Sequence, residues 1–174
     1  MFFLNLDLIY GQTTEFKKYT NQSYKFSFDI PSGWTIKYSK EQDGFICVPT
    51  TKTEKEMYED CFEGIVFRMF FYNLGLDTTL LKDGLYTKED DTYYITDRVN
   101  ESVKAENIHG KNWTGIYHNN VCGISCKENG FHAAGGQCQF IYFSNGTTTI
   151  CVTTNGREFA DDVLKRLINS FRFE

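Results

Sequence analysis

Six cysteines are the residues of this 174-residue chain with the clearest capacity for chemistry. An even number of cysteines in a chain rich in Tyr, Asn and Thr is typical of proteins from oxidising compartments, where thiols form disulfides. The spacing allows many pairings, so connectivity stays open. We expect structural disulfides among Cys47, Cys61, Cys122, Cys126, Cys138 and Cys151.

A zinc site is the alternative use of the same segment. His118, Cys122 and Cys126 follow one another at intervals of four, and His132 and Cys138 come next. Zinc takes nitrogen and thiolate ligands in a tetrahedron, and Cys122 with Cys126 has a suitable spacing. A second closely spaced cysteine pair is missing, and export would favour disulfides. We therefore predict no metal and no cofactor.

The sequence carries no established catalytic motif. Gly-x-Ser-x-Gly, Gly-x-Gly-x-x-Gly and the Walker loop are absent, and no local signature accompanies any cysteine. The acidic residues at 89–91 and Asp97 lack the spacing of a calcium loop and are read as a solvated turn. His109 precedes a turn glycine and is read as an exposed hairpin residue. We predict that the protein is not an enzyme.

Composition excludes two classes of partner. The net charge is −5 and the Lys and Arg residues are scattered, whereas nucleic-acid binding requires a clustered basic face. No stretch approaches the roughly 20 apolar residues of a membrane span. We expect the partner to be another protein, with no nucleic acid and no membrane span.

The start of the chain points to export. Residues 1–10 are mostly apolar, and Gly11-Gln12 ends the run before the chain becomes polar. This resembles the end of a secretory signal, although a basic segment is missing and Asp7 interrupts the run. We expect residues 1–12 to be a signal-peptide remnant or an apolar arm, and residues 13–174 to form one exported domain, periplasmic or extracellular.

Alternating apolar and polar residues predict mainly strands. Tyr24–Ile30 and Trp34–Tyr38 flank Pro31-Ser32-Gly33, which predicts an N-terminal β-hairpin. Gly64–Tyr72, the most apolar run, predicts a central strand. Further strands are expected at Gly44–Val48, Tyr93–Arg98, Val99–Ile108, Lys111–His118, Cys138–Phe143 and Thr147–Thr154, the last two joined through Asn145-Gly146.

Helical spacing is clearest at the end of the chain. Phe159, Val163, Leu167 and Phe171 recur at intervals of four and predict a closing amphipathic helix, capped by Asn155 with Glu158 as the capping-box partner. Helices are also expected within Leu74–Tyr86, beginning near Asp77, and at Thr53–Phe62. Val121–Gln137, rich in Gly, Asn and Cys, predicts a long irregular loop. This order of elements predicts an α+β fold, with helices on an antiparallel sheet.

The run Tyr24-Lys25-Phe26-Ser27-Phe28-Asp29-Ile30-Pro31-Ser32-Gly33-Trp34 resembles the opening hairpin of PsbP-like domains. The strand Ile65–Tyr72, the turn Ile108–Trp113 and the closing Ser170–Phe173 follow in the same order. This superfamily includes PsbP, DcrB-type envelope proteins and related adaptors. The resemblance implies an αβα sandwich around a central antiparallel sheet, and members that are mainly non-enzymatic. It implies no functional residue, and the cysteine-rich insert at 122–138 is not part of the pattern.

Three functions remain to be compared. The first is a non-catalytic exported or periplasmic binding or accessory protein. The second is a cytosolic adaptor or immunity-type protein that binds another protein, with reduced cysteines. The third is a small zinc- or thiol-dependent enzyme that uses the 118–138 segment. The even cysteine count and the apolar start favour the first.

Overall fold

The computed structural model describes residues 14–40, 43–51, 65–82, 84–96, 102–126, 130–156 and 158–174, with backbone alone at 123–126 and 130–136. The predicted signal remnant or arm at 1–12 and the predicted helix at Thr53–Phe62 lie outside these residues.

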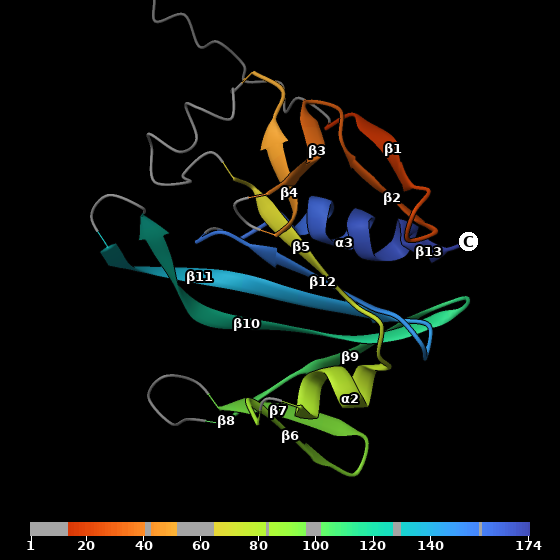
Figure 1. Ribbon diagram of the computed structural model, residues 1–174, viewed down its shortest axis with the longest axis vertical. Coiled ribbons are helices and arrows are strands. Elements are labelled where there is room, and N and C mark those ends of the chain that lie inside the picture. The colour runs from red at the N-terminus through yellow and green to blue at the C-terminus, as the bar shows by residue number, and fades with distance from the viewer. Residues whose placement is uncertain are drawn as a thin grey trace, which may run out of the picture.

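Seven strands form the central antiparallel sheet, in the order β3-β4-β5-β12-β11-β10-β9 (Figure 1). Their bounds are β3 Trp34–Ser39, β4 Gly44–Pro49, β5 Phe67–Tyr72, β9 Glu106–Gly110, β10 Trp113–Cys126, β11 Gly130–Ser144 and β12 Thr149–Thr154. The predicted central strand is confirmed, because β5 lies between β4 and β12. The predicted hairpin through Asn145-Gly146 is also confirmed, with Ser144 opposite Thr149.

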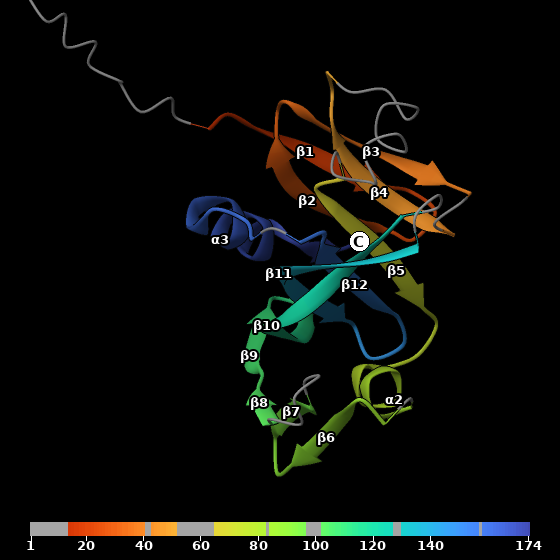
Figure 2. The same ribbon diagram turned by 90° about the vertical axis from the view of Figure 1, so that its left-hand side faces the viewer.

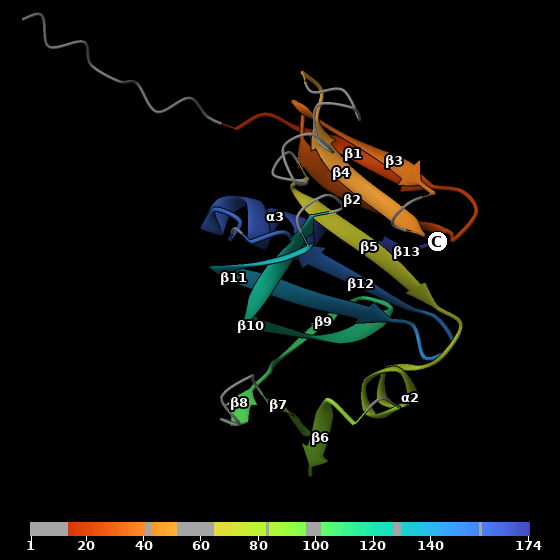
Figure 3. The same ribbon diagram turned by 60° about the vertical axis from the view of Figure 1, so that its left-hand side comes forward.

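Each face of this sheet is covered by a small sheet and a short helix (Figures 2 and 3). On one face lie β1 Phe16–Asn21, β2 Phe26–Pro31, β13 Arg172–Phe173 and helix α3 Asp161–Ser170. On the other lie helix α2 Leu76–Leu81, β6 Tyr86–Glu89, β7 Thr92–Thr96 and β8 Ser102–Lys104. The described residues are therefore mostly strand in antiparallel sheets, and the αβα sandwich implied by the resemblance is not confirmed. A helix of six residues is too short to cover a seven-stranded sheet, so three-stranded sheets complete both outer layers.

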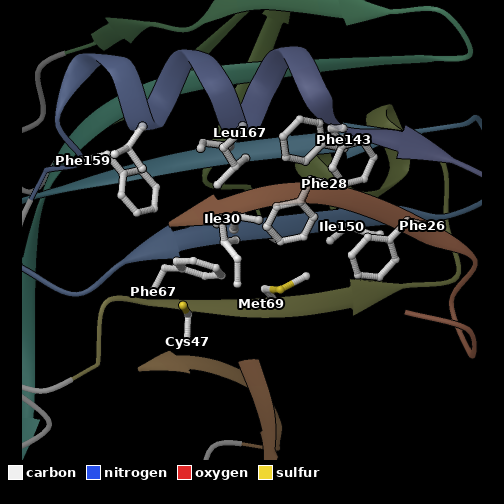
Figure 4. Close-up of a cluster of buried hydrophobic side chains, with 14 of the residues drawn as sticks. Phe26, Phe28, Ile30, Cys47, Phe67, Met69, Phe143, Ile150, Phe159 and Leu167 are labelled. Atoms are coloured by element: carbon white, nitrogen blue, oxygen red, sulfur yellow. The ribbon is translucent and has the colours of Figure 1, made fainter. Parts of the chain in front are cut away.

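The main core lies between the central sheet and the layer that contains β2 and α3. Figure 4 shows side chains from α3, β2 and the central strands pointing toward one another. Phe171 follows α3 and stacks on Phe143 of β11 with 3.8 Å between ring centroids. Trp34, at the margin of this core, lies near Phe159 and Phe67, with 5.9 Å and 6.2 Å between the ring centroids. A second core, around Ile116 and Tyr142, fills the opposite face.

The predicted pairing of Tyr24–Ile30 with Trp34–Tyr38 is wrong. The N-terminal hairpin is formed by β1 and β2, with Tyr19 opposite Phe28, while β3 pairs with β4 in the central sheet. The chain changes sheets at the Pro31–Gly33 turn. Both segments alternate apolar and polar residues because each lines the same core, and that pattern is also what a hairpin would show.

The predicted irregular loop at Val121–Gln137 is also wrong. Strands β10 and β11 form a long hairpin across this segment, with a register shift between Cys122 and Ile124. The backbone ladder supplies hydrogen bonds that do not depend on side-chain type, so glycine and asparagine do not prevent pairing. The disulfide between Cys122 and Cys138 joins the two strands, with 5.6 Å between Cα atoms.

Helix α3 lies within the segment predicted to be helical, but its N-terminal residue differs. The N-cap position is Ala160, and the predicted cap Asn155 instead accepts a hydrogen bond from Arg68 at 3.1 Å. Glu158 accepts one from Asn119, at 2.8 Å. The amide of Phe159 donates to the Gln139 side chain at 2.7 Å, which holds this residue on the sheet and outside the helix. Neither α2 nor α3, the helices of the described residues, has the length and apolarity needed to cross a membrane.

Candidate functional site

An open recess of about 660 Å³ lies between the central sheet and the layer that contains α2 and β6–β8. This volume lies within the roughly 300–1,000 Å³ typical of small-molecule sites. Its lining comes from the start of α2, the β6–β7 hairpin, β9, β10 and the β11–β12 turn: Gly75, Leu76, Asp77, Thr78, Lys88, Asp91, Tyr93, Asn107, Ile108, His109, Thr114, Gly115, Ser144 and Gly146.

Strand pairing places four polar side chains on one face of the central sheet. Thr114 lies opposite His109 of β9 and opposite Ser144 of β11, and Asn107 lies opposite Ile116. Because side chains alternate along a strand, these residues share the face of Ile116, which belongs to the second core. They form the floor of the recess where that apolar core ends.

A carboxylate, an ammonium and a phenol form one wall. The Lys88 ammonium lies 3.1 Å from each carboxylate oxygen of Asp77, and the Tyr93 hydroxyl donates a hydrogen bond to the same carboxylate. The Lys88 nitrogen also lies 5.0 Å from the centroid of the Tyr93 ring, within cation–π range. The wall is thus held by two contacts from Asp77 of α2 to the β6–β7 hairpin and by one contact within that hairpin, between Lys88 and Tyr93.

These contacts keep the ion pair charged near neutral pH. The hydrogen bonds from Tyr93 and Lys88 lower the pKa of Asp77, and the hydrogen bond to Asp77 raises the pKa of Lys88. Burial, together with the neighbouring carboxylate, raises the pKa of Tyr93 to about 12, so the phenol remains a donor. The wall therefore presents one positive and one negative charge that neutralise each other.

Several hydrogen-bonding groups of the recess have no partner among the described residues. The side-chain amide of Asn107 donates to the Asp91 carbonyl at 2.8 Å, which holds the amide and leaves its oxygen as an acceptor. The hydroxyls of Thr78 and Thr114 make no hydrogen bond there, and both residues are exposed. Ser144 is buried, and its hydroxyl accepts from the Gly146 amide at 3.2 Å. It also lies 3.0 Å from the Thr149 hydroxyl, whose single proton is donated to the Leu74 carbonyl at 2.8 Å, so Ser144 is satisfied within the protein.

The structure divides the predicted cysteines into three groups. Cys122 and Cys138 form a disulfide, as the sequence predicted for members of this set. Cys47 and Cys151 are free, buried thiols, so the prediction that they are bridged is wrong. Both lie inside strands whose neighbouring side chains are apolar, and burial raises both pKa values, that of Cys151 to about 12. Cys61 and the side chain of Cys126 lie outside the described residues.

The residues of the alternative zinc site are committed to other contacts where the structure describes their side chains. Cys122 and Cys138 are joined in the disulfide, whereas zinc requires thiolates. His118 is buried, with its Nε2 2.7 Å from the Tyr86 hydroxyl and its ring stacked on Phe140. The side chain of His132 lies outside the described residues, within which no three His, Cys, Asp or Glu side chains gather as metal ligands.

The other candidate residues from the sequence that the structure describes lie on the β6–β7 hairpin and on β9. Glu89, Asp90 and Asp91 lie at the exposed turn of this hairpin, as predicted, and Asp90 has a positive φ of 52°. Asp91 also lines the recess, and so does His109, which is exposed as expected. Asp97 lies outside the described residues.

The residues that make the recess polar were not identified from the sequence. Asp77, Lys88, Tyr93, Asn107 and Thr114 come from five elements, and no two of them form a recognisable motif. Only the α2 boundary near Asp77 and the turn residues near Asp91 and His109 carried a local signal. The site depends on pairing between strands that are distant in sequence.

Comparison with known proteins identifies similarities of low sequence identity. No family model matches the chain, and no curated protein matches it. Among solved structures, the chain is similar to a Bacteroides thetaiotaomicron protein, with 14% identity, a TM-score of 0.47, and coverage of 91% of this chain and 48% of that one. The chain thus spans about half the length of that protein. It is also similar to cyanobacterial PsbP (CyanoP) from Synechocystis, with 10% identity, a TM-score of 0.43, and coverage of 93% and 94%.

Proposed function

We propose that this chain is a non-catalytic, exported binding or accessory domain that holds a small polar molecule in the recess beside α2. The observation that carries the proposal is the preformed wall of Asp77, Lys88 and Tyr93, which faces unpartnered hydrogen-bonding groups in an open cavity of suitable size. Because the polar groups of this wall already hydrogen-bond to one another, the wall needs little reorganisation when a ligand binds.

The condition of the cysteines supports the non-catalytic and exported parts of this proposal. Thiolate is the reactive form of cysteine, and burial raises the pKa of both free thiols, Cys47 and Cys151. The Cys122–Cys138 disulfide is typical of an oxidising compartment. A cytosolic adaptor would keep these two cysteines reduced, and an enzyme built on residues 118–138 would need them as thiolates.

A nuclear magnetic resonance screen tests the binding function. The ¹⁵N-labelled full chain is titrated with separate mixtures of small sugars, amino acids and organic acids. We expect amide shifts in β9 and at Thr114 with at least one mixture, and much smaller shifts for Thr114→Val. The matched control is Thr35→Val, because Thr35 is also an exposed strand threonine but lies outside the recess. The proposal would be overturned if no amide of the recess shifted with any mixture, or if Thr114→Val and Thr35→Val gave equal shifts.

Mass spectrometry of protein isolated from its native host tests export. The Cys122–Cys138 peptide pair should be recovered as a disulfide from the extracytoplasmic fraction after the thiols are blocked during lysis. Recovery of both cysteines as blocked thiols from the cytosol would instead support the adaptor function.

A second candidate function, binding of another protein, is favoured by a surface cluster of aromatic side chains. Tyr24 stacks on Phe71 at 4.0 Å, Phe45 contacts Phe71 edge-on at 5.3 Å, and Tyr38 contacts Phe45 at 5.6 Å. Tyr24 and Tyr38 are exposed, and tyrosine is enriched in protein interfaces. A photocrosslinking residue at position 38 should capture the partner, whereas the same residue at Thr87, in the opposite layer, should not.

A further inference from the structure

We infer that the ligand of the recess is a neutral polyhydroxylated molecule, of the chemical class of a mono- or disaccharide. This inference rests on the proposed binding function and goes further by naming the ligand class. It depends on how charge is distributed in the lining, on the kind of hydrogen-bonding groups there, and on the apolar groups between them.

The charges of the lining disfavour an anionic ligand. Among the lining residues that the structure describes, Lys88 is the only lysine or arginine, and its ammonium is held by both carboxylate oxygens of Asp77. A phosphate or carboxylate ligand would have to compete with this intramolecular partner, while Asp91 adds a further negative charge. A built anion site has the opposite character, with several cationic or amide donors directed at one point.

The uncharged groups match hydroxyls. Thr78 and Thr114 each present a hydroxyl that both donates and accepts, and the Asn107 oxygen adds an acceptor. His109 supplies one ring nitrogen that donates and one that accepts when its imidazole is neutral. A ligand rich in hydroxyls satisfies such mixed groups in either direction, whereas an ammonium group can only donate and would leave the donors of the lining unpaired.

The remaining lining fits the apolar carbons of a sugar ring. The methyl groups of the half-buried Leu76 side chain form the aliphatic part of the lining. Gly75 and Gly146 expose backbone beside them, and the two backbones lie so close that a Cβ on Gly75 would be 2.7 Å from the Gly146 carbonyl oxygen. Glycine at position 75 is therefore required by the close approach of the two backbones.

Calorimetry with single compounds tests the ligand class. The full chain is titrated with glucose, galactose and maltose, with citrate and phosphate, and with putrescine, each at low salt and at high salt. We expect binding by at least one sugar, with an affinity unchanged by salt because no ion pair forms with a neutral ligand. Thr114→Val should weaken that binding about fivefold, the effect of one neutral hydrogen bond, and Thr35→Val should leave it unchanged.

The possible outcomes distinguish failure of the proposed ligand class from failure of the proposed binding function. Salt-sensitive binding of citrate, phosphate or putrescine, with no response to any sugar, would overturn the ligand class while the binding function remains supported. Sugar binding that Thr114→Val does not weaken would place the ligand elsewhere and overturn the inference. Binding by none of the compounds, together with no shifts in the recess during the resonance screen, would overturn both.

Discussion

Acidification from pH 7 to pH 5 should destabilise the fold mainly through one side chain, His118. This imidazole is 3% exposed, and burial lowers its pKa to about 4 from the ordinary value of 6.5. Between these two values the unfolded chain binds a proton that the folded chain does not. The stability contributed by the neutral imidazole is therefore complete above pH 6.5 and is lost as the pH falls toward 4.

The size of the effect follows from the two pKa values. At pH 5 the unfolded imidazole is almost fully protonated and the folded one almost fully neutral, which favours unfolding by about 2 kcal/mol relative to pH 7. For a chain of this length that corresponds to roughly 4–8 °C in melting temperature. Asp77 does not contribute in this interval, because its pKa is lowered from 3.8 and its carboxylate stays ionised at pH 5.

Urea unfolding at pH 7, 6 and 5 measures this loss directly. The free energy of unfolding should fall by about 2 kcal/mol more in the wild type than in His118→Gln, whose side-chain amide can still form a hydrogen bond with the Tyr86 hydroxyl. His109→Gln is the matched control, because His109 is exposed, and it should keep the wild-type pH dependence. Equal losses in the wild type and in His118→Gln would refute the assignment of the pH dependence to the buried imidazole.

Three further changes test the packing. Replacing both Cys122 and Cys138 by serine should cost about 3 kcal/mol, the loop-entropy value for a loop of about 15 residues, and an unchanged urea midpoint would contradict it. Phe171→Ala should cost about 3–5 kcal/mol, because the ring is fully buried; calorimetric unfolding with a loss below 1 kcal/mol would argue against this core. Gly115→Ala should unfold the chain or greatly lower its melting temperature, since a Cβ there would overlap the Tyr142 carbonyl oxygen, whereas Gly33→Ala, with open space around it, should not.

The two free thiols show where local sequence reasoning reached its limit. Counting cysteines predicts pairing, but Cys47 lies in the main core and Cys151 in the second, each surrounded by other buried side chains. Their distance from another thiol is set by which strands pair and which face each residue occupies. The number of cysteines in a sequence gives no information on strand pairing or on the face that each residue occupies.

The elements with strong local signals were predictable because their causes lie within a few residues. The amphipathic spacing of Val163, Leu167 and Phe171 identified the closing helical segment, and the Asn145-Gly146 turn identified the β11–β12 hairpin. The apolar run ending at Tyr72 identified the central strand β5. In each case side-chain periodicity or a turn conformation is sufficient to determine the local backbone.

Tertiary structure decided the remainder. Strands β2 and β3 follow one another through a turn yet belong to different sheets, and residues 122–126 and 130–137 pair as parts of β10 and β11 because each has a partner strand beside it. The recess requires Asp77, Lys88 and Thr114 to meet from three separate elements. Periodicity indicates which face of a strand is buried. What packs against that face depends on the free energy of packing the whole chain. The residues of the candidate site therefore come together only in the folded structure.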